Sequence, residues 1–246
     1  MIISERPRDI WTRLTVDPLA DPLARRIGRY SWVTPNRVTG AAFALSLVSA
    51  SCFAAGWLRL GGAAFIVRFF LDCLDGKVSR VQGSSSERGA YLDIAADVVG
   101  ISITFGALAW HQNRDDDLPT AVALALLASL VVYNWALSHR KHLADRIGWG
   151  TGGSEHRWRT TLPLVTSWLR LCHRLNMSAI PWVLEAEIAS LGLVPLLVPQ
   201  VTNSALVLVL VFYTVANVVN LRRIWNIARA LDTAPDTAPL DTRETR

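Results

Sequence analysis

Long apolar stretches separated by short polar and charged segments are the dominant pattern of this sequence. Six of these stretches approach the roughly 20 residues that a helix needs to cross a bilayer. They cover residues 38–57, 61–80, 89–110, 118–137, 182–198 and 204–221. The fifth is the least apolar, because it contains two glutamates and a proline. The pattern predicts an all-α, polytopic membrane protein with six transmembrane helices.

The segments on either side of these stretches differ from them in pattern. Within the N-terminal arm, residues 1–37, the segment 9–32 alternates apolar and basic positions and has aromatic residues at both ends. This predicts an amphipathic helix on the membrane surface, with a solvated arm as the alternative. We expect a six-helix membrane domain over residues 38–225. The segment 226–246 lacks apolar periodicity towards its end, and we expect a disordered cytoplasmic tail.

The distribution of basic residues predicts the orientation in the membrane. With six spans, 22 of the 25 lysines and arginines flank one membrane face, two flank the other, and Arg68 lies within a span. Because basic residues concentrate on the cytoplasmic side, we expect both termini in the cytoplasm. Charged residues make up only 18% of the chain, against about a quarter in soluble domains. This composition argues against a nucleic-acid partner and indicates the cell membrane.

Two pairs of aspartates stand at the facing ends of the second and third spans. Asp72 and Asp75 are three residues apart, and Asp93 and Asp97 are four residues apart. Each spacing places its pair on one face of a helix. Because the connection between the spans is short, we expect antiparallel neighbouring helices whose four carboxylates converge near the cytoplasmic mouth of the bundle.

A group of four carboxylates in a membrane protein needs compensating positive charge. Each one costs about 2.5–3.5 kcal/mol within a spanning helix, and the nearby basic residues are fewer than the acids. Oxygen-only ligation suits Mg²⁺, Mn²⁺ or Ca²⁺ rather than zinc. We therefore expect bound divalent metal, and the alternative is an internal salt-bridge network with no chemistry. For Arg68, one turn before Asp72, the candidate roles are neutralising Asp72 and contacting a headgroup. Carboxylate-bound metal beside Arg80, which can bind phosphate oxygens, indicates phosphoryl transfer on a lipid-linked substrate.

The same residues carry a resemblance to a known family. The pattern D-x-x-D-G-x-x-A-R, eight residues, G-x-x-x-D-x-x-x-D resembles the signature of the CDP-alcohol phosphatidyltransferases. Ser79 stands where the family usually has alanine, and the segment Thr34–Thr39 also looks like this family. The matching residues are Asp72, Asp75, Gly76, Arg80, Gly89, Asp93 and Asp97. The resemblance covers roughly residues 9–225.

The resemblance implies a role for each matched position. The four aspartates would hold two divalent cations, Mg²⁺ or Mn²⁺, and Asp97 would also deprotonate the acceptor hydroxyl. The CDP moiety of the substrate would lie against Asp75, Gly76, Ser79, Arg80 and Gly89. The leaving group would be CMP. These roles agree with the needs of the chemistry, since a hydroxyl needs a base and a pyrophosphate leaving group needs its charge neutralised.

The identity of the acceptor remains open at this point. Arg140, Lys141 and Arg174 are candidates for binding a phosphorylated acceptor such as inositol phosphate or glycerol phosphate, although the cytoplasmic excess of basic residues would also place them there. Glu185 and Glu187 do not share a helix face, and we expect ordinary polar contacts at the end of the bundle.

Three functions compete. The first moves a phosphatidyl group from CDP-diacylglycerol to a small hydroxyl acceptor. The second moves a CDP-linked headgroup onto a lipid hydroxyl, and the third is a membrane transporter that uses the aspartates as an ion site. The absence of an internal repeat argues against the third. We favour the first, and we expect the enzyme to be a homodimer.

Overall fold

A computed structural model of the chain describes residues 10–84, 86–114, 118–146, 167, 170–172, 174 and 183–233, and every regular element in these ranges is helical. The long helices are α2 (Pro35–Ala54), α3 (Leu58–Gln82), α4 (Glu87–Arg114), α5 (Thr120–Arg146) and α9 (Thr202–Thr233). The shorter elements are η1 (Thr12–Val16), α1 (Asp17–Ile27), α7 (Val183–Glu187), η2 (Ile188–Leu193), α8 (Val194–Leu197) and η3 (Pro199–Val201).

Helices α3 and α4 both pack against α2, which brings the two halves of the aspartate pattern to one end of the molecule. The contact face of α2 is built from small residues, so the backbones approach closely. Ser49 Oγ donates a hydrogen bond to Gly61 O of α3 over 2.8 Å. On the other side, a Cβ on Gly100 of α4 would lie 2.6 Å from Ser46 Oγ. The expected antiparallel pair of helices is therefore braced chiefly through a third helix.

The boundaries of α2 and α3 follow from local chemistry. Thr34 caps α2, since its hydroxyl accepts a hydrogen bond from Arg37 N, and Pro35 occupies the first turn, where its missing N–H costs nothing. Gly83 ends α3 in the left-handed conformation, with φ of 60°, which glycine adopts without a steric penalty. This turn reverses the chain directly after Arg80 and sends it into α4.

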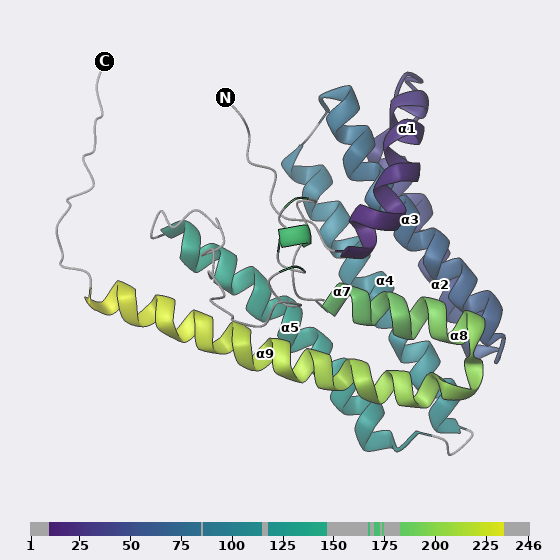
Figure 1. Ribbon diagram of the computed structural model, residues 1–246, viewed down its shortest axis with the longest axis vertical. Coiled ribbons are helices and arrows are strands. Elements are labelled where there is room, and N and C mark those ends of the chain that lie inside the picture. Colours follow the sequence, from purple (N-terminus) through teal and green to yellow (C-terminus); the bar gives the residue numbers. More distant parts are fainter. Residues whose placement is uncertain are drawn as a thin grey trace.

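The second half of the molecule is a long pair of helices with a shorter helical stretch beside it. Helices α5 and α9 lie side by side over much of their length (Figure 1). The helical stretch from α7 through η2 to α8 packs against α3 on one side and α9 on the other. Aromatic contacts close the core between the halves, with Phe105 of α4 and Tyr133 of α5 edge-on to Tyr213 of α9.

The observed helices agree with the six apolar stretches, but they are longer than most of them. Within the described ranges, four helical segments are long and apolar enough to cross a membrane, namely Pro35–Ala54, Glu87–Arg114, Thr120–Arg140 and Pro199–Asp232. Helix α3 has 25 residues but carries the charged pattern, and the stretch from α7 to α8 is short. Helix α9 continues to Thr233, so the first part of the segment expected to be a disordered tail is helical. Residues 234–246 lie outside the described residues.

The N-terminal helix α1 packs against α3. Its buried residues Ala20 and Ala24 belong to one apolar cluster with Val78 of α3 and Ile188 of η2. On another face of α1, Leu19 is 65% exposed. Part of the apolar surface of this segment is therefore used inside the protein, and part of it is exposed.

Candidate active site

The four aspartates gather at the end of the molecule where α3 turns into α4. Asp75 is the most enclosed of the four, with only 5% of its surface exposed. The Thr39 hydroxyl of α2 donates a 2.5 Å hydrogen bond to Asp75 Oδ2. The carboxyl group of Asp93 on α4 is close enough to Asp75 on α3 for the two to interact electrostatically. We call Asp72, Asp75, Asp93 and Asp97 the acidic cluster.

A buried arginine lies among these carboxylates. Arg68 is only 2% exposed. Its Nη2 lies 3.7 Å from Asp72 Oδ1 and forms a closer ion pair with Asp97 Oδ1. The expected partnership of Arg68 with Asp72 is therefore present, and the pairing with Asp97 on α4 adds a connection that the sequence did not predict.

The oxygen donors of the acidic cluster fit a hard divalent cation, but the carboxylates do not surround one common point. Among the described residues, no three acidic, histidine or cysteine side chains are placed to hold a metal ion together. Part of the reason is that Asp97 faces Arg68. The guanidinium of Arg68 lies between the carboxylates of Asp72 and Asp97, so this position stabilises positive charge. The salt-bridge alternative is therefore realised in part.

The remaining matched positions lie along the same end of α3 and the start of α4. A Cβ on Gly76 would meet just one atom group outside its own turn, Arg80 Nη1 at 3.6 Å. Protein packing therefore does not require glycine here, whereas close approach of a bound molecule would. Arg80 is exposed and Ser79 half-buried. Gly89 N donates to Ser86 Oγ at the start of α4.

Lys77, which follows Gly76 directly, forms a buried ion-pair cluster that sequence reasoning missed. It is 5% exposed. Its Nζ lies 2.6 Å from Asp17 Oδ1 and also pairs with Asp21, both on α1. Asp17 is itself 3% exposed. The N-terminal helix is thus fixed by charge to the turn of α3 that carries Gly76.

A cavity of about 170 Å³ opens beside Asp97. Polar groups from other helices reach it, namely Tyr133 and Asn134 of α5 and Glu187 of α7. Its full lining is Asp97, Val98, Ile101, Leu130, Tyr133, Asn134, Leu137, Val183, Leu184 and Glu187. Glu187 is buried and accepts a hydrogen bond from the Tyr213 hydroxyl. The expectation of a contact at the end of the bundle is wrong for Glu187, because the structure places it in the interior.

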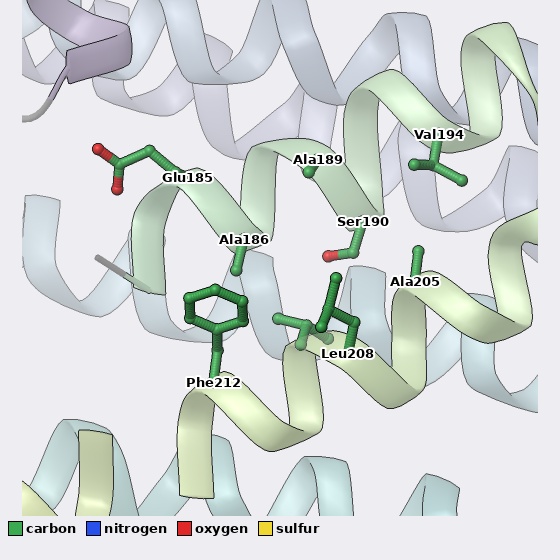
Figure 2. A pocket seen from close by; sticks show the side chains of 9 residues that line it. Glu185, Ala186, Ala189, Ser190, Val194, Ala205, Leu208 and Phe212 are labelled. Atoms are coloured by element: carbon green, nitrogen blue, oxygen red, sulfur yellow. The ribbon is translucent and has the colours of Figure 1, made fainter. Parts of the chain in front are cut away.

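A second cavity, of about 210 Å³, lies between η2 and α9 (Figure 2). Small and apolar side chains such as Ala189, Ala205 and Leu208 line most of it. Glu185 stands at its edge and accepts a 3.2 Å hydrogen bond from Ile10 N. This contact between chain segments is the ordinary polar role expected of Glu185.

The candidate acceptor residues are only partly brought together. Arg140 of α5 is half-buried, and its Nη1 donates a 2.8 Å hydrogen bond to Asn220 Oδ1 of α9. Arg174 is an exposed helical residue. The side chain of Lys141 lies outside the described residues. Arg140 is on the same helix as four residues of the Asp97 cavity, which makes it the best placed of the three.

The sequence is similar to those of several known proteins. The sequence model of the CDP-alcohol phosphatidyltransferases matches residues 32–213. Phosphatidylinositol phosphate synthase of Mycolicibacterium smegmatis is 32% identical over 181 residues, which cover 72% of this chain and 78% of that protein. Archaetidylinositol phosphate synthase of Pyrococcus horikoshii is 36% identical over 120 residues, 48% of this chain and 59% of that protein.

Solved structures show the same fold. The crystal structure of Mycobacterium tuberculosis phosphatidylinositol phosphate synthase with CDP-DAG bound has a TM-score of 0.53 and 19% identity, covering 85% of this chain and 94% of that one. A second crystal structure of that enzyme contains manganese and citrate, with the same TM-score and 84% of this chain covered against 89% of that one. The family match over most of the chain carries the assignment. This chain belongs to the CDP-alcohol phosphatidyltransferase family, the membrane transferases of phospholipid biosynthesis.

Proposed function

We propose that this enzyme transfers a phosphatidyl group from CDP-diacylglycerol to the hydroxyl of an inositol phosphate, with release of CMP. Three relatives support this choice of acceptor, since the proteins of Mycolicibacterium smegmatis, Cutibacterium acnes and Corynebacterium glutamicum are all phosphatidylinositol phosphate synthases. The donor is supported by the structural neighbour that holds CDP-DAG. The proposal selects the first of the three functions that the sequence left open.

The position of Asp97 is the observation that carries the proposal. Asp97 belongs to the acidic cluster, and it also lines the 170 Å³ cavity. A carboxylate that is shared by a metal-binding cluster and a cavity can act on a molecule bound in that cavity. The other polar groups of the cavity, from Tyr133 and Asn134, can hydrogen-bond the hydroxyls of a polyol. We therefore assign this cavity to the acceptor and call it the acceptor cavity.

The chemistry follows from the side chains around it. Asp72, Asp75, Asp93 and Asp97 would hold two divalent cations, Mg²⁺ or Mn²⁺, which neutralise charge on the pyrophosphate when bound. Gly76, Ser79, Arg80 and Gly89 would receive the CDP moiety together with Asp75, and the open face of Gly76 allows close approach. The Asp97 carboxylate takes the proton of the acceptor hydroxyl as that oxygen forms a bond to the β-phosphorus and CMP leaves.

Arg140 is proposed to bind the phosphate of the acceptor, with Lys141 and Arg174 as further candidates. Its guanidinium can hold phosphate through two parallel hydrogen bonds. In the structure Arg140 is held by Asn220, an uncharged partner that leaves its positive charge uncompensated by that contact. Charge for an anionic group is thus available on the helix that lines the acceptor cavity.

We further propose that the chain crosses the membrane six times, with α3 and the stretch from α7 to α8 as the two crossings that composition alone does not identify. The domain would cover residues 38–225, and both termini and the acidic cluster would face the cytoplasm. The N-terminal helix would lie at the membrane surface with Leu19 towards the lipid. We also propose a homodimer, which cross-linking in membranes would test.

The acceptor assay is the decisive experiment. Purified enzyme in detergent is given labelled CDP-diacylglycerol and Mn²⁺ with inositol phosphate, inositol, glycerol phosphate or serine, and the lipid product is identified by mass. We expect product and stoichiometric CMP with inositol phosphate, and we expect Arg140→Gln to raise the KM for that acceptor. A product with another alcohol would overturn the acceptor. CMP release from a CDP-alcohol and diacylglycerol would instead support headgroup transfer.

A further inference from the structure

The strongest unexplained feature of the acidic cluster is that Arg68 stands inside it. Its side chain is 3% exposed, and a buried guanidinium costs several kcal/mol unless carboxylates compensate it. Arg68 lies one helical turn before Asp72 on α3, and Nη2 lies between Asp72 and Asp97. The guanidinium carbon lies over the ring of Phe65, 5.7 Å from the ring centre, which is a cation–π contact. The position is thus fixed on both the polar and the apolar side.

Arg68 connects two helices that pack mainly on α2 rather than on each other. Helices α3 and α4 are both packed on α2, so the distance between Asp72 and Asp97 is not set by direct packing of their backbones. The ion pair from Arg68 to Asp97 crosses that space. The orientation of Asp97, the base of the proposed reaction, therefore depends on a side chain outside the family pattern.

The same contact opposes the binding of a divalent cation. An Asp97 oxygen paired with a guanidinium has to give up that partner before it can coordinate a metal ion. The remaining charge near Arg68 comes from Asp72 and from Glu187, whose carboxylate also acts on the guanidinium electrostatically. Arg68 Nε is buried without a hydrogen-bond partner. The arginine can therefore turn from Asp97 and still keep anionic neighbours.

We propose that Arg68 is a resident counter-cation of the acidic cluster, a positioning residue that holds Asp97 towards Asp72 and releases it when a divalent cation binds. The inference rests on the metal site of the proposed function. Removal of the arginine charge lowers the thermal stability of the metal-free protein. It also raises the affinity for the metal ion, since a competing positive charge has been removed.

The test compares Mn²⁺ binding and thermal stability for a series of variants. Arg68→Met keeps an unbranched apolar side chain and removes the charge. Arg68→Lys keeps a charge, but its compact ammonium cannot bridge both carboxylates as the planar guanidinium does. Arg59→Gln is the control, because Arg59 is exposed at the other end of α3. Binding is followed through the electron paramagnetic resonance signal of free Mn²⁺, without substrates.

We expect Mn²⁺ to bind Arg68→Met at least about tenfold more tightly than wild type, which is about 1.4 kcal/mol. Arg68→Lys should lie between the two, and Arg59→Gln should match wild type. The melting temperature of Arg68→Met should fall without metal and show a larger rise on Mn²⁺ addition. If Arg68→Met does not fold, the Mn²⁺ affinity of Arg68→Lys relative to wild type tests the proposal.

Equal or weaker Mn²⁺ binding in the folded arginine variants would overturn the proposal. A wild-type protein that binds no Mn²⁺ at all would instead refute the metal site of the proposed function, so the two failures are distinguishable.

Discussion

Replacement of Lys77 by methionine tests how the N-terminal helix is held to the acidic end of the molecule. Methionine has a similar length, so the change removes charge with little loss of volume. Asp17, 3% exposed and 2.6 Å from Lys77 Nζ, would stay buried without that ammonium group. Breaking a buried pair by removing one partner costs about 3–5 kcal/mol.

The remaining contacts of α1 set the value within that range. Arg13 Nη1 lies 3.5 Å from Asp17 Oδ2, but its side chain is 40% exposed, and such a pair contributes at most about 1 kcal/mol. We therefore expect a loss of about 3 kcal/mol in the docking of α1 on α3. Because every 1.4 kcal/mol is a factor of ten, the undocked population should rise about 100-fold.

Limited trypsin digestion measures this undocking directly. Arg25 and Arg26 lie in the last turn of α1, and cleavage there reports the open population when opening is fast relative to cleavage. The double variant Lys77→Met with Asp17→Asn is the matched control, since it also removes the buried negative charge that Lys77 compensated and should recover much of the protection. A single variant that is cleaved less than about fivefold faster than wild type would refute the reasoning, as would a double variant no better protected than the single one.

Three further predictions concern the reaction and the topology. Asp97→Asn should lower kcat by about 10²–10⁴-fold and leave the affinity for CDP-diacylglycerol much less affected, whereas Arg80→Ala should weaken that affinity; near-normal kcat for Asp97→Asn would remove it as the base. EDTA should abolish turnover and Mg²⁺ or Mn²⁺ should restore it, so full activity in metal-free buffer would contradict the proposed metal site. A cysteine at Ser84, in a protein whose native cysteines are replaced, should react with impermeant thiol reagents only after cells are permeabilised; labelling of intact cells would reverse the topology.

Much of the helical architecture can be predicted from the sequence because apolar length and chain-reversing residues are local properties. Each of the six apolar stretches corresponds to a helix or to a continuous helical stretch, and the boundaries at Thr34 and Gly83 follow from the local chemistry of those residues. The C-terminal end of α9 was not predicted, because no change in apolar pattern marks it. Helix α9 continues to Thr233 because a helix does not have to stop where its membrane-spanning part does.

The same distinction between local and long-range features applies to the candidate active site. The aspartate pairs are predictable, since their spacing within each helix fixes a shared face. The partnerships of Lys77 with Asp17 and of Glu187 with Tyr213 are not, because they join residues 60 and 26 positions apart. From the sequence, Lys77 was interpreted as one of the cytoplasmic basic residues, and Glu187 was expected to make ordinary polar contacts. The one available signal was the presence of ionisable residues inside apolar stretches, which are costly there without a partner.

The division of the molecule into two helical groups has a consequence for how this scaffold can be re-engineered. The acidic cluster lies entirely on α3 and α4 and is braced by α2. Much of the acceptor cavity wall comes from α5 and from the segment beginning at Val183. With the proposed function, donor activation and most of the acceptor site would occupy separate stretches of the chain, and α4 would contribute to both, with Asp97, Val98 and Ile101 lining the acceptor cavity. A chimera that keeps residues 10–114 and takes residues 118–233 from a relative with another alcohol substrate would exchange the product lipid while it retains the same phosphate chemistry.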